Sequence, residues 1–216
     1  QMLQRHFPFE RGVEVGIEVH PPVTTFGQIS TLYAQGFNRL SMGVQDFDPK
    51  VQERVNRIQS FEQTRDLIAH ARRCGFTSVN VDLMYGLPLQ TLEGFGRTLD
   101  RVEEFRPDRL AVFGYAHVPQ LKKHQTVFET SELPGPELRL KLLELANARL
   151  VAAGYVAIGL DHFALPDDEL LKSRKNGTLR RNFMGYATGA ETDLLAFGPS
   201  SISEVGGYYA QNARDV

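Results

Sequence analysis

The apolar residues of this chain recur with helical spacing in some segments and gather into short β-forming runs between them. Helical spacing predicts helices near residues 25–35, 60–73, 92–105 and 136–153. Residues 13–19 form a β-rich run, and further runs follow helix ends at the joints 34–42, 73–82, 105–113 and 153–161. Strands that alternate with helices of this length predict parallel βαβ units.

Capping residues mark the ends of these helices. Asp48 precedes Pro49, which is the order of an N-cap and a proline at the first helical position. Ser60 and Gln63 have the spacing of a capping box. Gly75 suits the left-handed position that follows a helix end. The capping signals therefore agree with the alternation of helices and strands.

The number of repeats limits the architecture. About four βαβ units precede residue 118, whereas a closed barrel of eight units needs about 250 residues. Residues 118–135 are richer in Pro, Lys and Gln and read as a connection. After residue 164 we expect a short helix at 166–171, an irregular stretch at 181–186 and Gly-rich short strands at 197–209. We predict an α/β fold with part of a (β/α) barrel in residues 1–117, followed in 118–216 by the connection and an α+β extension.

Composition narrows the class of protein. Of 216 residues, 42% are hydrophobic and 23% charged, and the formal net charge is -2. This balance argues against a general nucleic-acid binder, which is usually basic. No apolar run approaches the roughly 20 residues that span a bilayer, and the first residues lack a signal-peptide pattern, so we expect a cytoplasmic protein. Cys74 is the single cysteine, which excludes an internal disulfide and a cysteine-rich metal site within these residues.

Polar residues follow each expected strand. They are Glu18 and His20, Gln45 and Asp46, Asp82, Tyr115 and His117, and Asp161 and His162. Ligands bind at the carboxyl ends of strands in parallel α/β folds, so these side chains predict one shared site. The alternative is that each residue is an isolated polar cap. The three histidines with Asp161 also leave a metal site open, although no H-x-H or H-E-x-x-H spacing is present. The basic stretch 172–181 is either a solvated face or a clamp for an anion.

Four longer strings are more specific than any of these single residues. Residues 36–47, 80–88, 160–170 and 181–186 resemble the oxygen-independent coproporphyrinogen III oxidases, which are radical S-adenosylmethionine enzymes. The resemblance extends from about Val13 to the end of the chain. It implies a radical-SAM-type barrel and oxidative decarboxylation of two propionates of coproporphyrinogen III to vinyl groups, giving protoporphyrinogen IX in heme biosynthesis.

The resemblance also implies cofactors and the residues that hold them. The family uses a 4Fe-4S cluster and two molecules of S-adenosylmethionine. Glu18 matches a contact to the first molecule. Gln45, Arg57 and Asp82 match positions that hold the second, and Ala116 and Ile202 match positions that line the same second site. The implied partners are coproporphyrinogen III and an electron donor such as a flavodoxin or ferredoxin, acting on a monomer that binds no nucleic acid.

One departure from the family pattern concerns the cluster. The motif C-x-x-x-C-x-x-C is missing; in the family it lies upstream of the segment matched here, together with two barrel strands and a Gly-Gly-Thr segment. We therefore expect a partial chain that is inactive alone and contains no metal ligands. Two alternatives remain: a heme chaperone of the sister radical SAM family, and a cluster-free homologue that binds an anion. Asp46 and the string 181–186 favour the oxidase.

Overall fold

The computed structural model describes residues 5–182, 185–188 and 193–215. The chain divides into two compact units, residues 1–165 and residues 166–216. The sequence suggests a boundary between residues 117 and 118, which would separate the barrel segment from the connection and the extension. That boundary stays a prediction.

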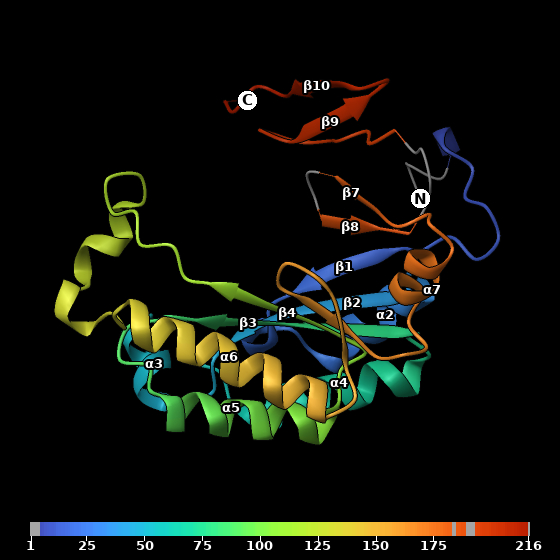
Figure 1. The fold of residues 1–216 in the computed structure, drawn as a ribbon. Helices are drawn as coiled ribbons and strands as arrows, with labels where there is room; N and C mark the ends of the chain where they lie inside the picture. The colour runs from blue at the N-terminus through green and yellow to red at the C-terminus, as the bar shows by residue number, and fades with distance from the viewer. Residues whose placement is uncertain (1–4, 183–184, 189–192, 216) are drawn as a thin grey trace. The chain divides into compact units, whose positions relative to one another are not determined.

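A six-stranded sheet forms the centre of the first unit (Figure 1). Strands β1 (Gly16–Val19), β2 (Arg39–Gln45), β3 (Ser78–Tyr85) and β4 (Arg109–Gly114) are parallel neighbours in chain order, with β1 at the edge. This part of the sheet confirms the predicted run of βαβ units and the α/β class.

The last two strands of the sheet correct the sequence prediction. Strands β5 (Val156–Gly159) and β6 (His162–Ala164) form an antiparallel hairpin, and β6 rather than β5 pairs with β4, also antiparallel. The run at 153–161 therefore does not add one more parallel strand beside β4. Asp161 lies in the hairpin turn instead of at a strand end, and Leu160 adopts a positive φ of 49° there.

The helices of the first unit lie where the sequence predicts them. They are α2 (Phe26–Ala34), α3 (Pro49–Arg54), α4 (Phe61–Cys74), α5 (Leu92–Phe105) and α6 (Pro136–Ala152). Asp48 caps α3 and Ser60 caps α4, where its side chain accepts from the Gln63 N–H. Gly75 ends α4 with a φ of 110°. The connection after β4 contains two short 3-10 helices, η2 (Lys123–Val127) and η3 (Thr130–Glu132). A third, η1 (Pro21–Val23), follows β1.

One face of the sheet packs against these helices to form the core. Alternate residues of each strand are fully buried on that face: Leu40, Met42 and Val44; Val79, Val81 and Leu83; Leu110 and Val112. They meet Ile68 of α4, Phe95 of α5 and Leu142 of α6. Because side chains alternate across a strand, the residues between them face the opposite side.

The second unit contains helix α7 (Glu169–Lys175), capped by Asp168, and two hairpins. Strand β7 (Arg180–Asn182) pairs with β8 (Gly185–Ala187), and β9 (Ile202–Val205) pairs with β10 (Tyr208–Gln211). The short helix and the Gly-rich strands are confirmed. The stretch 181–186, expected to be irregular, contributes to β7 and β8 instead, and its Phe183 and Met184 lie outside the described residues. Across the described part of the chain, no helix has the length and apolar character to cross a membrane.

Candidate functional site

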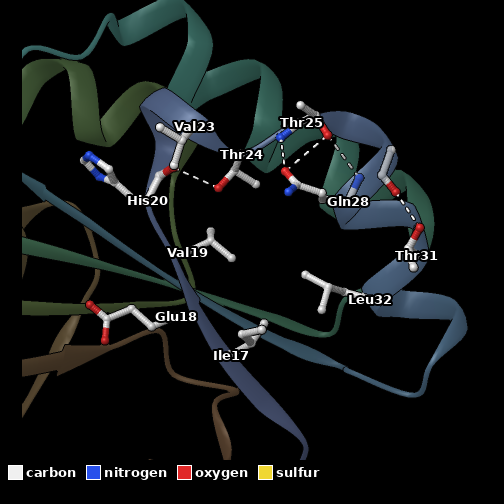
Figure 2. Close-up of a pocket in the computed structure, with 11 residues that line it drawn as sticks. Ile17, Glu18, Val19, His20, Val23, Thr24, Thr25, Gln28, Thr31 and Leu32 are labelled. Atoms are coloured by element: carbon white, nitrogen blue, oxygen red, sulfur yellow. Dashed lines mark hydrogen bonds between the residues drawn. The ribbon is translucent and has the colours of Figure 1, made fainter.

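The sheet face opposite the helices carries a polar surface. The strand register places Glu18, Ser41, Asn80 and Arg109 in one row, and Gly43, Asp82, Ala111 and His162 in the next row towards the carboxyl ends of β1–β4. Figure 2 shows Glu18 and His20 pointing away from the side on which Ile17 and Val19 lie. The predicted gathering of strand-end residues on one side is therefore present for Glu18 and His20 after β1, Gln45 of β2, Asp82 of β3 and His162 after the β5–β6 turn. The prediction is wrong for Asp46, which is buried and hydrogen-bonded to Thr98 of α5.

Asp82 is the charged centre of this surface. The Asn80 side-chain amide bridges Ser41 Oγ (2.9 Å) and Asp82 Oδ1 (2.7 Å) by donating to both. Burial raises the pKa of Asp82 above its ordinary value; the Asn80 hydrogen bond opposes this shift, the Glu18 charge adds to it, and His162 and Arg57 oppose it. Burial thus raises the pKa more than the hydrogen bond and the positive neighbours lower it. A cationic ligand would stabilise the charged carboxylate.

Gln45 and Arg57 converge on Gly43. Arg57 Nη2 donates to the Gly43 carbonyl at 2.9 Å. A Cβ on Gly43 would lie 2.8 Å from both Arg57 Nη2 and Gln45 Nε2, so only glycine leaves room for the two side chains. Gln45 Oε1 and Arg57 Nε are buried and have no hydrogen-bond partner in the described residues. Buried polar atoms are normally paired, so this acceptor and this donor fit a polar ligand.

Two histidines border the same surface. His20 Nδ1 lies 3.5 Å from Arg57 Nη2, and desolvation, followed by the Arg57 charge, lowers the pKa of His20. His162 Nδ1 lies 2.6 Å from Asp161 Oδ1, and its ring meets the Phe113 ring edge-on at 5.9 Å. His20 is therefore a neutral hydrogen-bonding group at neutral pH, and His162 is oriented by its neighbours.

Ala116 and Ile202 lie on other segments of the chain. Ala116 follows β4, and its carbonyl accepts from Gln125 Nε2 at 3.0 Å, while Gln125 Oε1 accepts from the Val118 N–H at 2.6 Å. Ala116 thus lies just before the connection 118–135, and Gln125 fixes the backbone at this point by hydrogen bonds. Ile202 is the first residue of β9 in the second unit, and its place in the site stays a prediction.

An open hollow of about 750 Å³ lies between β1 and α2 (Figure 2). Its apolar lining comes from Ile17, Val19, Val23 and Leu32, and its threonines are Thr24 and Thr25 before α2 and Thr31 within it. Glu18 and His20 border it, but their side chains point away (Figure 2). The hollow is therefore separate from the polar strand-end surface.

The metal site that the sequence leaves open is not formed. Within the described ranges, no group of three or more His, Cys, Asp or Glu side chains is placed to hold a metal ion. Cys74 is a free thiol at the end of α4. The basic stretch 172–181 lies in the second unit, where Lys172 pairs with Glu169.

Sequence reasoning missed two residues of the site, Gly43 and Asn80. Both had a signal. A lone glycine within a strand pattern indicates close approach of other groups. Asn80 and Asp82 alternate with apolar residues in the run Ser78–Tyr85, so they share one face of a strand whose other face is buried.

Comparisons with known proteins show what the chain is similar to. Residues 2–102 match the family model of the radical SAM superfamily. The chain is 49% identical over its whole length to the oxygen-independent coproporphyrinogen III oxidase of Escherichia coli (strain K12), and covers 47% of that protein. It is 47% identical to the Pseudomonas aeruginosa protein of the same name, over 94% of this chain and 44% of the relative. The chain thus spans about half the length of these curated relatives.

A solved structure extends the match to three dimensions. The coproporphyrinogen III oxidase of Escherichia coli, described as a radical SAM enzyme, superposes with a TM-score of 0.96 at 49% identity. The match covers 99% of this chain and 49% of that one. The fold is therefore a segment of a radical-SAM-type barrel with an α+β extension, as the sequence predicts.

Proposed function

We propose that the chain belongs to the radical S-adenosylmethionine superfamily, whose family model matches residues 2–102, and that its full-length gene product is an oxygen-independent coproporphyrinogen III oxidase. It converts two propionates of coproporphyrinogen III to vinyl groups and yields protoporphyrinogen IX. The observation that carries this proposal is the identity of 49% with such an enzyme along the whole of this chain.

The polar surface fits S-adenosylmethionine, whose methionyl part carries an ammonium and a carboxylate. Arg57 suits the carboxylate, since guanidinium pairs well with that group. Asp82 suits the ammonium, which would offset the cost of its burial. Gln45 offers a buried acceptor without a partner. Bound S-adenosylmethionine and the cluster together supply the hydrogen-abstracting radical of this superfamily.

The residues divide between two molecules of S-adenosylmethionine. Glu18 lies on the edge strand β1, which is next to β2 and is separated from β3 by β2. It contacts the ribose hydroxyls or the amino group of the first molecule. Gln45, Arg57 and Asp82 hold the second molecule. Ala116 and Ile202 line that second site by backbone or apolar contact. Because the Ala116 carbonyl already accepts from Gln125, the N–H and the methyl group of Ala116 make this contact.

The cluster requires thiolates that residues 1–216 do not supply, since Cys74 is their single cysteine. The proposal therefore places three cysteine ligands elsewhere in the full-length gene product. The substrate is coproporphyrinogen III, and a flavodoxin or ferredoxin delivers the electrons to a monomeric enzyme in the cytoplasm.

The test is a turnover assay on the full-length gene product, prepared anaerobically with iron and sulfide. The expected result is protoporphyrinogen IX, carbon dioxide and 5′-deoxyadenosine from coproporphyrinogen III, S-adenosylmethionine and a reductant. Absence of vinyl product from a cluster-loaded protein that cleaves S-adenosylmethionine would overturn the oxidase assignment.

The two alternatives give different results in the same preparation. A heme chaperone would bind heme and transfer it to an acceptor protein without making vinyl groups. A cluster-free homologue is suggested by the single cysteine, and it would lack the three cysteines in the full-length gene and retain no iron.

A further inference from the structure

A buried polar network that the proposed chemistry does not use lies between the ends of β2 and β3 and helix α5. Its members are Asp46, Gln52, Gln59, Gln90 and Thr98, of which Asp46 is 2% and Thr98 1% exposed. Buried polar networks are costly unless their members are paired, and paired networks fix one local arrangement. Here Gln59 Oε1 is the one side-chain atom of these five residues that is buried without a partner in the described part of the chain. The network adjoins Gln45, one of the residues assigned to the second S-adenosylmethionine.

The Asp46 carboxylate is the centre of the network. Its Oδ1 accepts from Thr98 Oγ1 at 2.5 Å and from the Asp48 N–H at 2.8 Å, and its Oδ2 accepts from Gln90 Nε2 at 2.6 Å. The Phe47 N–H also donates to Thr98 Oγ1, at 3.0 Å. The end of β2 is thereby tied to α5.

Gln90 carries the connection to the end of β3. Its Oε1 accepts from the N–H groups of Gly86 (2.6 Å) and Leu87 (3.3 Å), and its Nε2 donates to the Met84 carbonyl at 3.0 Å as well as to Asp46. Each end of the Gln90 amide therefore has a fixed role, and the direction of the amide is set by the carboxylate opposite it.

The backbone on both sides of Gln45 belongs to the same network. The Val44 carbonyl accepts from the Asp46 N–H (2.9 Å) and from Gln59 Nε2 (3.0 Å). The Asp46 carbonyl accepts from Gln52 Nε2 at 2.9 Å. Between these two fixed peptide groups, Gln45 has a φ of 68°. A left-handed conformation costs a non-glycine residue roughly 1–2 kcal/mol, so the surrounding bonds must hold it.

Burial disfavours the charged form of the Asp46 carboxyl. Burial raises the pKa of Asp46, and the hydrogen bonds from Thr98, Asp48 and Gln90 offset this only in part. Buried charges of this kind often contribute less to stability than to a unique local geometry. The geometry here is that of Gln45 and of the loop after β3.

We propose that Asp46 is a positioning residue for the second S-adenosylmethionine site, and that through Thr98 and Gln90 it fixes the left-handed Gln45 and the loop at Gly86. This inference rests on the proposed function, because it assumes that Gln45 contacts S-adenosylmethionine. Asp46 touches no cofactor itself; it sets the direction in which the Gln45 side chain leaves the strand end.

The substitution Asp46→Asn tests the direction of the amide. Asparagine keeps one acceptor for Thr98 and the Asp48 N–H, but presents an N–H to Gln90 Nε2. A flip of the Gln90 amide would relieve that contact and oppose its N–H to the N–H of Gly86 instead. Either arrangement sets two donors against each other, so the end of β2 must shift. Adding Gln90→Glu restores an acceptor towards both the new N–H and Gly86, at the loss of the bond to Met84.

The measurement is equilibrium binding of S-adenosylmethionine to the cluster-loaded, full-length protein, with the cluster absorption spectrum recorded for each variant. Asp46→Asn should weaken binding of the second molecule on the order of tenfold, with the cluster spectrum unchanged. The double variant Asp46→Asn with Gln90→Glu should recover most of that loss. Leu142→Ala in α6, which removes a fully buried core side chain, is the control for lost stability and should leave binding unchanged.

Two outcomes would overturn the inference. One is that Asp46→Asn binds S-adenosylmethionine with wild-type affinity. The other is that Leu142→Ala loses as much affinity as Asp46→Asn when both variants lower the urea midpoint by the same amount. A wild-type protein that binds a single S-adenosylmethionine would overturn it as well. A wild-type protein that binds two molecules yet makes no vinyl product would refute the oxidase proposal alone, because the Asp46 comparison is read from binding.

Discussion

Arg57 donates from Nη2 to the carbonyl of Gly43, and its guanidinium then occupies the space where a side chain at position 43 would begin. Gln45 Nε2 lies 2.8 Å from the same position. Two of the side chains assigned to the second S-adenosylmethionine, Arg57 and Gln45, can therefore take these positions because Gly43 has no side chain.

Gly43→Ala should impair the cofactor site without unfolding the protein. The added methyl group would meet only the far ends of two flexible side chains, which can move aside at little cost to the fold. Their displacement should raise the KM for S-adenosylmethionine on the order of tenfold, measured in anaerobic turnover. Gly96→Ala is the matched control, since nothing lies within 4 Å of its Cβ in α5. It should leave KM unchanged and stabilise the helix by about 0.5–1 kcal/mol. Equal KM values in both variants would contradict the assignment of Gln45 and Arg57.

Asp82→Asn should separate binding from stability. Asparagine retains the acceptor for Asn80 but cannot pair with an ammonium, so S-adenosylmethionine use should fall roughly 10- to 100-fold. The urea midpoint at neutral pH should not fall, because the variant removes a buried charge that lies beside Glu18. Ser41→Ala, which removes the other acceptor of Asn80, is a control that should affect binding less. A lowered midpoint with unchanged binding would make Asp82 a structural residue.

The same variant has a defined pH dependence. The pKa of Asp82 is raised in the folded state. Its contribution to stability is therefore fully present below the unfolded pKa and is lost as the pH rises through the folded pKa. The urea midpoint of Asp82→Asn relative to wild type should rise as the pH is increased from about 4 towards 7. A difference that is constant over this range would mean that the carboxyl is not perturbed.

One arginine of α3 makes the polar contacts that join this helix to the connection after β4, beside the packing of Phe128 and Leu133 in the cluster that contains Val51. Arg54 forms a two-pronged pair with Glu132, through Nε and Nη2 at 2.6 Å each, and Nη2 also donates to the Val127 carbonyl. Arg54→Ala should loosen residues 118–135 and with them the segment at Ala116, which limited proteolysis of the full-length protein would detect as faster cleavage in this connection. Lys141→Ala, which breaks an exposed pair with Glu137 on α6, should not change the cleavage rate.

Local sequence signals predicted most of the first unit. Helix α5 was predicted to its observed ends because Thr91 caps it and its apolar residues recur on one face. The β5–β6 hairpin was not predicted because strands of four and three residues carry no signal of direction, and because its turn has Leu160 rather than a glycine at positive φ. The site shows the same division. Glu18 and Asp82 were predicted from their positions at the ends of expected strands, whereas Arg57 lies outside any strand and was predicted from the family resemblance alone. The contact of Asp46 with Thr98 joins residues 52 positions apart, which no local pattern encodes.

The polypeptide of residues 1–216 should not assemble a 4Fe-4S cluster. Such a cluster takes cysteine thiolates as its ligands, and this stretch offers Cys74 alone, at the end of α4 with its sulfur 3.4 Å from His70 Nε2. After anaerobic treatment with iron and sulfide, gel filtration should yield protein without stoichiometric iron and without the visible absorption of a cluster. Cys74→Ser is the control, and it should behave identically. Stoichiometric iron that disappears in Cys74→Ser would assign Cys74 to a cluster, shared between molecules, and would refute the placement of all three ligands outside residues 1–216.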